Sequence, residues 1–263
     1  MPTTSLLGKH QVPVGTGLCI RLGMLTLWVK RRPAEWQLAS ELNATADQAI
    51  ADIAHLKAPA ALPASLSPAR FACRTAETPT LTLRLALADR HIVSRPAMRF
   101  RLLEKEQVDI FIGTPLWLQL FDGDRLLCDL PTRVLKSTWF GPDTRTGRLC
   151  YATQTAARVL LDDILKRRTG VVTKVTVINR TDRLFIFDRV NIPIPSLTTY
   201  SDTNGTIWTE DIVVAHDRDE HATVQLSGTA PALAEGAKLI TPARQPAPRS
   251  ILVRAVEQLR AER

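Results

Sequence analysis

The sequence lacks any long hydrophobic run. No stretch reaches the roughly 18 uninterrupted apolar residues that a membrane helix needs, and the nearest candidate, 18–29, is broken by Arg21. The N-terminus also lacks a basic segment followed by an apolar run, so the sequence predicts no secretory signal. We therefore expect a cytoplasmic protein, with peripheral association with a membrane as an alternative.

Local signatures of catalysis are also missing. The chain contains no GxSxG, HExxH, P-loop or GxGxxG pattern. Its four cysteines, Cys19, Cys73, Cys128 and Cys150, include no CxxC pair, which argues against a zinc ribbon or a thioredoxin-like site. We expect buried free thiols instead. We also expect no cofactor and identify no catalytic residue, although a glycosidase-type carboxylate pair would leave no local signature.

The net charge of +8 raises the question of nucleic-acid binding. The 34 Lys and Arg residues are spread along the chain, however, and no helix-turn-helix, zinc-finger or RNA-recognition pattern accompanies them. Nucleic acid is therefore not the expected partner, and an anionic membrane surface or an acidic partner is favoured over it. Arg31 and Arg32, at a predicted turn, are interpreted as solvated.

Alternating apolar and polar residues, typical of half-buried strands, recur along the chain. Leu81, Leu83 and Leu85 share one face of such a run, and Asp-Gly-Asp at 122–124 predicts a hairpin. A second hairpin is predicted between 132–140 and 148–153. The segment 171–200 places two runs of β-branched and aromatic residues around the polar break 179–183, which predicts an antiparallel hairpin.

Three segments favour helices. Residues 45–58 are Ala-rich, 156–169 carry apolar residues at i, i+4 spacing, and 250–263 are amphipathic. The Pro- and Ala-rich stretch 58–69 is interpreted as a flexible excursion. The predicted fold class is all-β and mainly antiparallel, with one or two β-sandwich domains, a covering helix and a C-terminal amphipathic helix.

The corresponding domain organisation has five parts. N-terminal strands occupy 1–42, the helix and linker or insertion 43–73, a first β-sandwich 74–154, the covering helix with a second β-sandwich 155–228, and a linker with the C-terminal helix 229–263.

One loop contains residue types that bind metals. His216 and His221 flank a predicted hairpin tip, and two imidazoles with the carboxylate of Asp219 could hold a divalent cation. The positive charge of Arg218 in the same loop opposes this, so an ordinary charged hairpin tip is the competing interpretation.

Four aromatic residues lie in the middle strands: Trp117, Trp139, Phe140 and Tyr151. We interpret them as core residues, because Trp is usually buried in a sandwich. An exposed strip that stacks on sugars or ligand rings is the alternative.

Three stretches, LGMLTLWVKRRPAEW, RVLKSTWFGPDTRTGRLCY and VTVINRT with RVNIPIPSLTTY, resemble an uncharacterised prokaryotic family known only as a domain of unknown function. The resemblance covers about two thirds of the chain. It implies no catalytic residue, and it implies a neighbourhood of small mechanosensitive channels.

Together these features favour a non-catalytic binding or regulatory module that contacts a protein partner. Association of this module with a membrane or a channel is an additional expectation. Contact of the C-terminal helix with an anionic membrane is a further option. The alternative class is a metal-dependent hydrolase or a carbohydrate-active enzyme.

Overall fold

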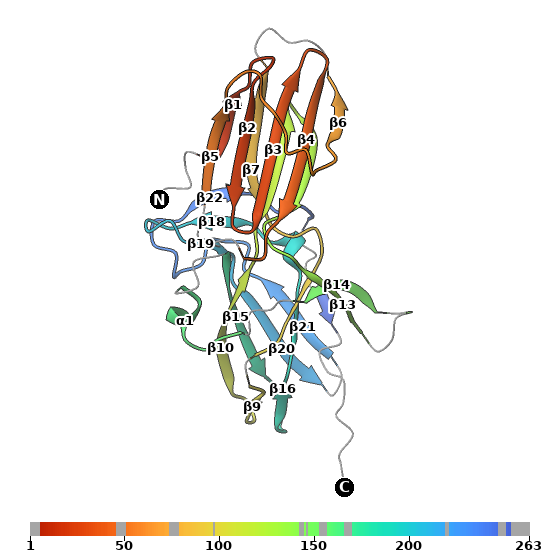
Figure 1. Ribbon diagram of the computed structural model, residues 1–263. Coiled ribbons are helices and arrows are strands. Elements are labelled where there is room, and N and C mark those ends of the chain that lie inside the picture. The colour runs from red at the N-terminus through yellow and green to blue at the C-terminus, as the bar shows by residue number, and fades with distance from the viewer. Residues whose placement is uncertain are drawn as a thin grey trace. The chain divides into compact units, whose positions relative to one another are not determined.

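The computed structural model describes residues 6–45, 51–73, 79–96, 98–141, 145, 147–152, 157–165, 170–218, 221–246 and 251–253. The chain divides into two units, the first made of residues 1–86 and 116–134 and the second of 87–115 and 135–263. Both consist mainly of antiparallel β-sheets (Figure 1). The predicted all-β, mainly antiparallel class is therefore confirmed.

Within its described residues the first unit contains two sheets. One has the order β1 (Gly8–Gln11), β7 (Thr80–Ala86), β11 (Trp117–Asp122) and β12 (Arg125–Pro131). The other has the order β5 (Ala51–Leu56), β2 (Gly17–Leu22), β3 (Leu25–Arg32), β4 (Glu35–Leu42) and β6 (Ala69–Ala72). The two sheets lie face to face (Figure 1).

Strand alternation builds the core of the first unit. Leu81, Leu83 and Leu85 of β7 are buried, as the sequence predicts, and so are Leu27 and Val29 of β3. The predicted Asp-Gly-Asp hairpin is confirmed because β11 pairs with β12 and the connecting Gly123 has a positive φ of 60°.

The described residues of the second unit form a large sheet, a smaller mixed sheet and a strand pair. The large sheet has the order β22 (Lys238–Thr241), β18 (Thr199–Ser201), β19 (Ile207–Thr209), β15 (Val171–Asn179), β20 (Ile212–Arg218), β21 (His221–Leu226) and β23 (Ile251–Val253), with β10 (Gln107–Thr114) paired to β15. The smaller sheet has the order β13 (Lys136–Phe140), β14 (Arg148–Ala152), β8 (Ile92–Ser94) and β17 (Val190–Ile192), and β16 (Phe185–Phe187) pairs with β9 (Phe100–Leu102).

Strand β15 is the centre of the large sheet. Its predicted inward face, which includes Val171, Val175 and Val177, is buried. On the other face a cluster of Phe111, Val172 and Trp208 packs under the short helix α1 (Leu161–Leu165). The sheet therefore has one face in the core and one face that is only partly covered.

The hairpin predicted over 171–200 is wrong. One edge of β15 pairs antiparallel with β10, and the other pairs in parallel with β19 and β20. Because both edges are occupied, the chain that follows β15 pairs elsewhere: β16 with β9 and β17 with β8. After β17 the 3-10 turn η2 (Ile194–Ser196) leads to β18.

The helix predictions are largely wrong. Residues 51–56 of the predicted helix 45–58 form β5, because the edge of β2 is available for pairing and tertiary pairing overrides a weak local preference. Of the covering helix predicted over 156–169, only Leu161–Leu165 is helical among the described residues, as α1. Ala157 and Arg158 form isolated β-bridges instead. At 251–253 the chain forms β23 on the edge of β21 instead of a helix, and 254–263 lie outside the described residues.

Residues 58–69 are not a free excursion. Ala60 is buried, and its N–H donates to the carbonyl of Gly15 at 2.9 Å, so this Pro- and Ala-rich stretch packs on the first unit. In the described part of the chain, no helix is long and apolar enough to cross a membrane.

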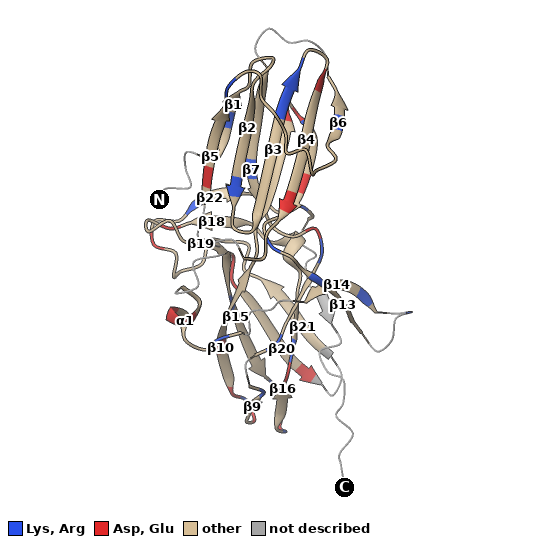
Figure 2. Cartoon of the chain, in the orientation of Figure 1, with Lys and Arg blue, Asp and Glu red and all other residues tan. Residues whose placement is uncertain are grey.

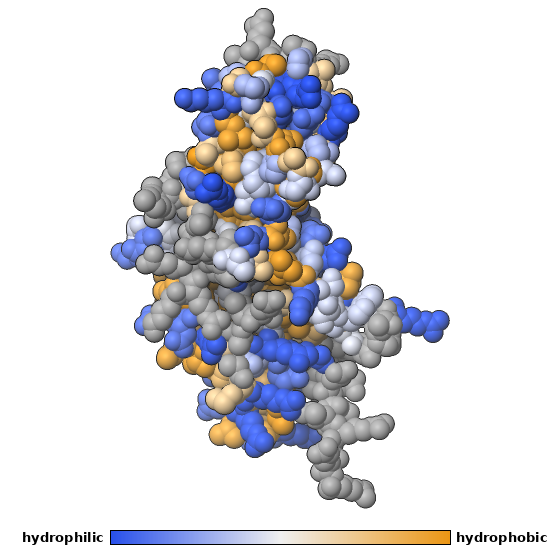
Figure 3. Space-filling view, viewed as in Figure 1, coloured by the Kyte–Doolittle hydropathy of each residue, from blue (hydrophilic) through white to orange (hydrophobic). Residues whose placement is uncertain are grey.

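Charged residues of both signs are distributed over both units (Figure 2). The space-filling view shows hydrophobic residues among hydrophilic ones at the end of the second unit that holds β9 and β16 (Figure 3). The exposed Leu103, Leu184 and Ile186 belong to this end.

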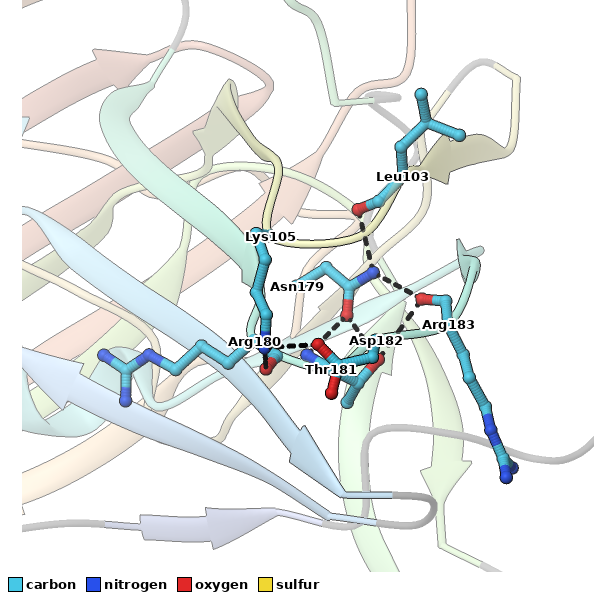
Figure 4. Close-up of polar contacts among 7 residues, drawn as sticks. All are labelled: Leu103, Lys105, Asn179, Arg180, Thr181, Asp182 and Arg183. Atoms are coloured by element: carbon cyan, nitrogen blue, oxygen red, sulfur yellow. Dashed lines mark hydrogen bonds and ion pairs between the residues drawn. The ribbon is translucent and has the colours of Figure 1, made fainter.

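The break at 179–183 is organised by the side chain of Asn179, which is fully buried at the end of β15. Its amide nitrogen donates to the carbonyls of Leu102, Leu103 and Arg183 at 3.2, 2.9 and 2.8 Å. Its side-chain oxygen accepts from the N–H and hydroxyl of Thr181 at 3.1 and 2.8 Å (Figure 4). One residue thus ties the polar break to the chain that follows β9.

Lys105 makes a second link between the same segments. Its ammonium group donates to the carbonyl of Arg180 and lies 2.8 Å from Asp182 Oδ1 (Figure 4). Because both side chains of this ion pair are largely exposed, it adds little to the stability that the buried amide provides.

Candidate interaction site

Strands β13 and β14 form an antiparallel hairpin that projects from the second unit (Figure 1). Its register pairs Lys136 with Ala152 and Phe140 with Arg148, which confirms the hairpin predicted between 132–140 and 148–153. Where the two strands meet the connecting loop, Gly141 and Gly147 approach closely, since a Cβ on Gly141 would lie 2.5 Å from the Cα of Gly147. Glycine therefore permits the loop to close at this point.

The hairpin has one buried and one outward face, because side chains alternate along each strand. Phe140 and Cys150 point to the buried face, where they pack with Val93 of β8. Trp139 and Leu149 are direct cross-strand neighbours on the other face and are 46% and 37% exposed. Tryptophan is enriched at interfaces, where its ring contributes a large apolar area.

Tyr151 extends this outward face and is held in position. Its hydroxyl donates to Asp89 Oδ1 at 2.9 Å, and the guanidinium carbon of Arg90 lies 5.4 Å from its ring centroid. Tyr151 pairs with Ser137, so it lies diagonally across from Trp139. We name Trp139, Leu149 and Tyr151 the outward strip.

This arrangement corrects part of the core interpretation of the four aromatic residues. Trp117 and Phe140 are buried, as predicted, but Trp139 is exposed. The sequence carries no signal for this difference, since both tryptophans lie in alternating strands and only their surroundings distinguish them.

A polar cluster of the buried His91 and Asn191 and the exposed Arg148 fixes the hairpin to the rest of the second unit. His91 is buried, its Nδ1 lies 3.2 Å from Asn191 Oδ1, and the guanidinium group of Arg148 contacts its Nε2. Burial, reinforced by the positive charge of Arg148, lowers the pKa of His91 to about 4. The ring is therefore neutral at pH 7, donating from Nδ1 to Asn191 and accepting at Nε2 from Arg148.

Cys150 adjoins this cluster without being activated by it. Its Sγ donates to Asn191 Oδ1 at 3.9 Å, and burial raises the pKa of the thiol to about 11 although Arg148 opposes the shift. A nucleophilic cysteine needs a thiolate. His91, Cys150 and Asn191 therefore meet here in a structural and not a catalytic arrangement. Because they lie far apart in the chain, no sequence motif indicated that they would meet.

Arg31 is another residue that sequence reasoning misjudged. It is buried, its guanidinium carbon lies 4.8 Å from the ring centroid of Trp36, and Nη1 contacts Cys73 Sγ. Arg32 is exposed, as predicted. All four cysteines are free, as expected, but Cys73 and Cys128 are only partly buried.

The predicted metal site is only partly described. His216 is buried and its ring stacks on Phe185, with the centroids 4.2 Å apart. The register pairs His216 with Ala222 and His221 with Arg218, so the histidines are not cross-strand partners. Asp219 and the side chain of His221 lie outside the described residues, and among the rest no group of three metal-binding side chains occurs. The site stays a prediction.

One pair of carboxylates lies on the partly covered face of the large sheet. Lys174 Nζ is 3.1 Å from Asp109 Oδ2, and Thr176 donates to Asp109 Oδ1 at 2.6 Å. Burial raises the pKa of Asp211, with Lys174 opposing and Asp109 reinforcing the shift. Lys174 forms an ion pair with Asp109, so its charge balances one of the two carboxylates.

The described residues define an all-β protein built mainly from antiparallel sheets in two units. Residues 6–259 match the model of a family described as "Protein of unknown function (DUF432)", and the chain belongs to this family. The predicted resemblance to an uncharacterised domain family is thereby confirmed. No curated protein and no solved structure matches the chain. The expected channel neighbourhood is not tested by these comparisons and stays a prediction.

Proposed function

We propose that this protein is a non-catalytic binding module that contacts a protein partner through the outward strip of the β13–β14 hairpin. The observation that carries the proposal is the exposure of Trp139 beside Leu149 on a projecting hairpin. Tryptophan, tyrosine and arginine dominate the binding energy of protein interfaces. The strip offers Trp139 and Tyr151, and Arg90 adjoins it.

The polar cluster beneath the hairpin supports this proposal. A contact surface gains affinity when it is ordered before its partner arrives, because less conformational entropy is then lost on binding. His91, Arg148 and Asn191 join β14 to β8 and β17 through hydrogen bonds, of which the one between His91 and Asn191 is buried and the one from Arg148 is partly buried. The strip is therefore presented on a fixed support.

The test uses the full-length protein as bait in extract of its own source cells, with proteins quantified by mass spectrometry. The Trp139→Ala variant should lose a partner that the wild type retains. Leu126→Ala is the matched control, because Leu126 is similarly exposed, at 44%, on β12 of the first unit. With the purified partner, Trp139→Ala should weaken binding by about 2 kcal/mol, or roughly 30-fold.

Two results would contradict the proposal. One is a set of captured proteins that is identical for Trp139→Ala and the wild type. The other is Trp139-dependent sedimentation with anionic lipid vesicles in the absence of a protein partner, which would assign the strip to a membrane surface. Thermal unfolding of each variant establishes that the comparison is made between folded proteins.

A further inference from the structure

Strand β13 forms an edge of the smaller sheet. In the order β13, β14, β8 and β17 it is the terminal strand, and in the described part of the chain it pairs with β14 alone. An edge strand presents a row of backbone N–H and C=O groups that another strand can bind. Here the edge belongs to the same hairpin that carries the outward strip.

The hydrogen bonds of β14 determine which groups of β13 point outward. The N–H of Tyr151 donates to the carbonyl of His91, which directly precedes β8, so residue 151 is turned towards β8 and away from β13. Backbone groups alternate between the two edges of a strand. Residues 148, 150 and 152 of β14 therefore bond to residues 140, 138 and 136 of β13. This leaves the N–H and C=O of Ser137 and Trp139 at the open edge.

The charge of the hairpin selects the occupant. Residues 136–152 contain Lys136, Arg145 and Arg148 against the single acidic residue Asp143. The described residues of β13 and β14 carry only basic charges (Figure 2). A second copy of this chain would bring these cations against their equivalents, whereas an acidic segment would be attracted to them. Charge complementarity therefore favours an acidic partner over self-association.

We propose that the open edge of β13 takes up an extended acidic segment of a partner protein as an additional strand. The segment would exchange backbone hydrogen bonds with Ser137 and Trp139, and an apolar side chain of the segment would pack on the indole of Trp139. Acidic side chains would lie near Lys136. This inference rests on the proposed function, because it specifies how the partner binds to that hairpin.

The test measures amide hydrogen exchange by NMR on the full-length protein with a capped octapeptide of alternating Glu and Val. At a free peptide concentration about ten times its Kd, exchange at Ser137 and Trp139 should slow by about tenfold. Exchange at Thr138 and Phe140, which already bond to β14, should change little. An alternating Lys and Val peptide, and a Glu and Val peptide N-methylated at every amide, should both fail to bind.

Two variants separate the contribution of backbone hydrogen bonds to peptide binding from the contribution of charge. Ser137→Pro removes an N–H from the open edge without removing a bond to β14, so it should abolish peptide binding and leave thermal unfolding near that of the wild type. Lys136→Glu should reverse the charge preference of the edge. It should weaken binding of the Glu and Val peptide and allow binding of the Lys and Val peptide. This second variant keeps the test informative if the proline disturbs folding.

Each other outcome overturns the inference. Binding that perturbs the indole of Trp139 but does not protect the amides of Ser137 and Trp139 indicates docking on the face of the hairpin. Protection without peptide that grows with protein concentration indicates a second copy. If no peptide binds while Trp139→Ala still loses its partner in the capture assay, strand addition is refuted and the proposed function stands. If no peptide binds and Trp139→Ala captures the same proteins as the wild type, strand addition and the proposed function are both refuted.

Discussion

Replacing Asn179 by Ala should destabilise the second unit strongly. The side-chain amide has two hydrogens for three carbonyl acceptors, of Leu102, Leu103 and Arg183, so one hydrogen is shared. Removing a buried hydrogen bond costs about 1 kcal/mol net. The expected decrease in the free energy of unfolding is therefore about 3 kcal/mol, which for a unit of this size lowers Tm by roughly 6–12 °C.

Differential scanning calorimetry tests this prediction, and Asn43→Ala provides the matched control. Asn43 makes the same two local bonds, accepting from the N–H and hydroxyl of Thr45 at 2.9 and 2.7 Å, but it is exposed and lies in the first unit. Its removal should cost about 0.5 kcal/mol or less. If Asn179→Ala loses no more stability than Asn43→Ala, the buried amide does not organise the break after β15 and the reasoning is refuted.

Four further outcomes are expected. The carboxylate of Glu210 accepts backbone N–H groups at 3.0 and 2.7 Å, so Glu210→Ala should cost about 2–3 kcal/mol in urea unfolding, and a loss below about 0.5 kcal/mol would contradict that role. Because the pKa of His91 is lowered to about 4 from an ordinary 6.5, its stabilising contribution is present above pH 6.5 and should be lost as the pH falls towards 4; an NMR titration midpoint near 6.5 would show otherwise. With its pKa raised to about 11, the thiol of Cys150 should resist iodoacetamide at pH 8 in the native protein, as peptide mass mapping would show, and rapid native labelling would mean that the thiol is not shielded. If the predicted metal site exists, elemental analysis should find stoichiometric metal that His221→Ala loses, and equal metal content in both proteins would remove that site.

Local patterns predicted the parts of the fold that local interactions control. The hairpins β11–β12 and β13–β14 follow from short polar loops between alternating runs, because a turn brings its own flanking residues into register. The burial of Leu81 and Val175 follows from alternation within a single strand. The family resemblance also followed from sequence alone.

Pairing between distant segments was not predictable in this way. The antiparallel partner of β15 is β10, more than 50 residues earlier, and nothing in either strand specifies the other. Residues 51–56 of the helix predicted over 45–58 and residues 251–253 of the helix predicted over 250–263 are strands, because the edges of β2 and β21 were available to them. Local propensity is weak compared with the hydrogen bonds and burial that a sheet edge provides.

The candidate site shows the same division. The sequence by itself determined that the chain alternates with a period of two, and hence that it is an all-β protein with aromatic residues in its middle strands. Only the tertiary structure decided that Trp117 is covered while Trp139 is exposed, and that His91, Arg148 and Asn191 meet beneath the hairpin. The reason is physical: alternation assigns a residue to a face of its strand, whereas the layer that covers that face is supplied by segments distant in the chain.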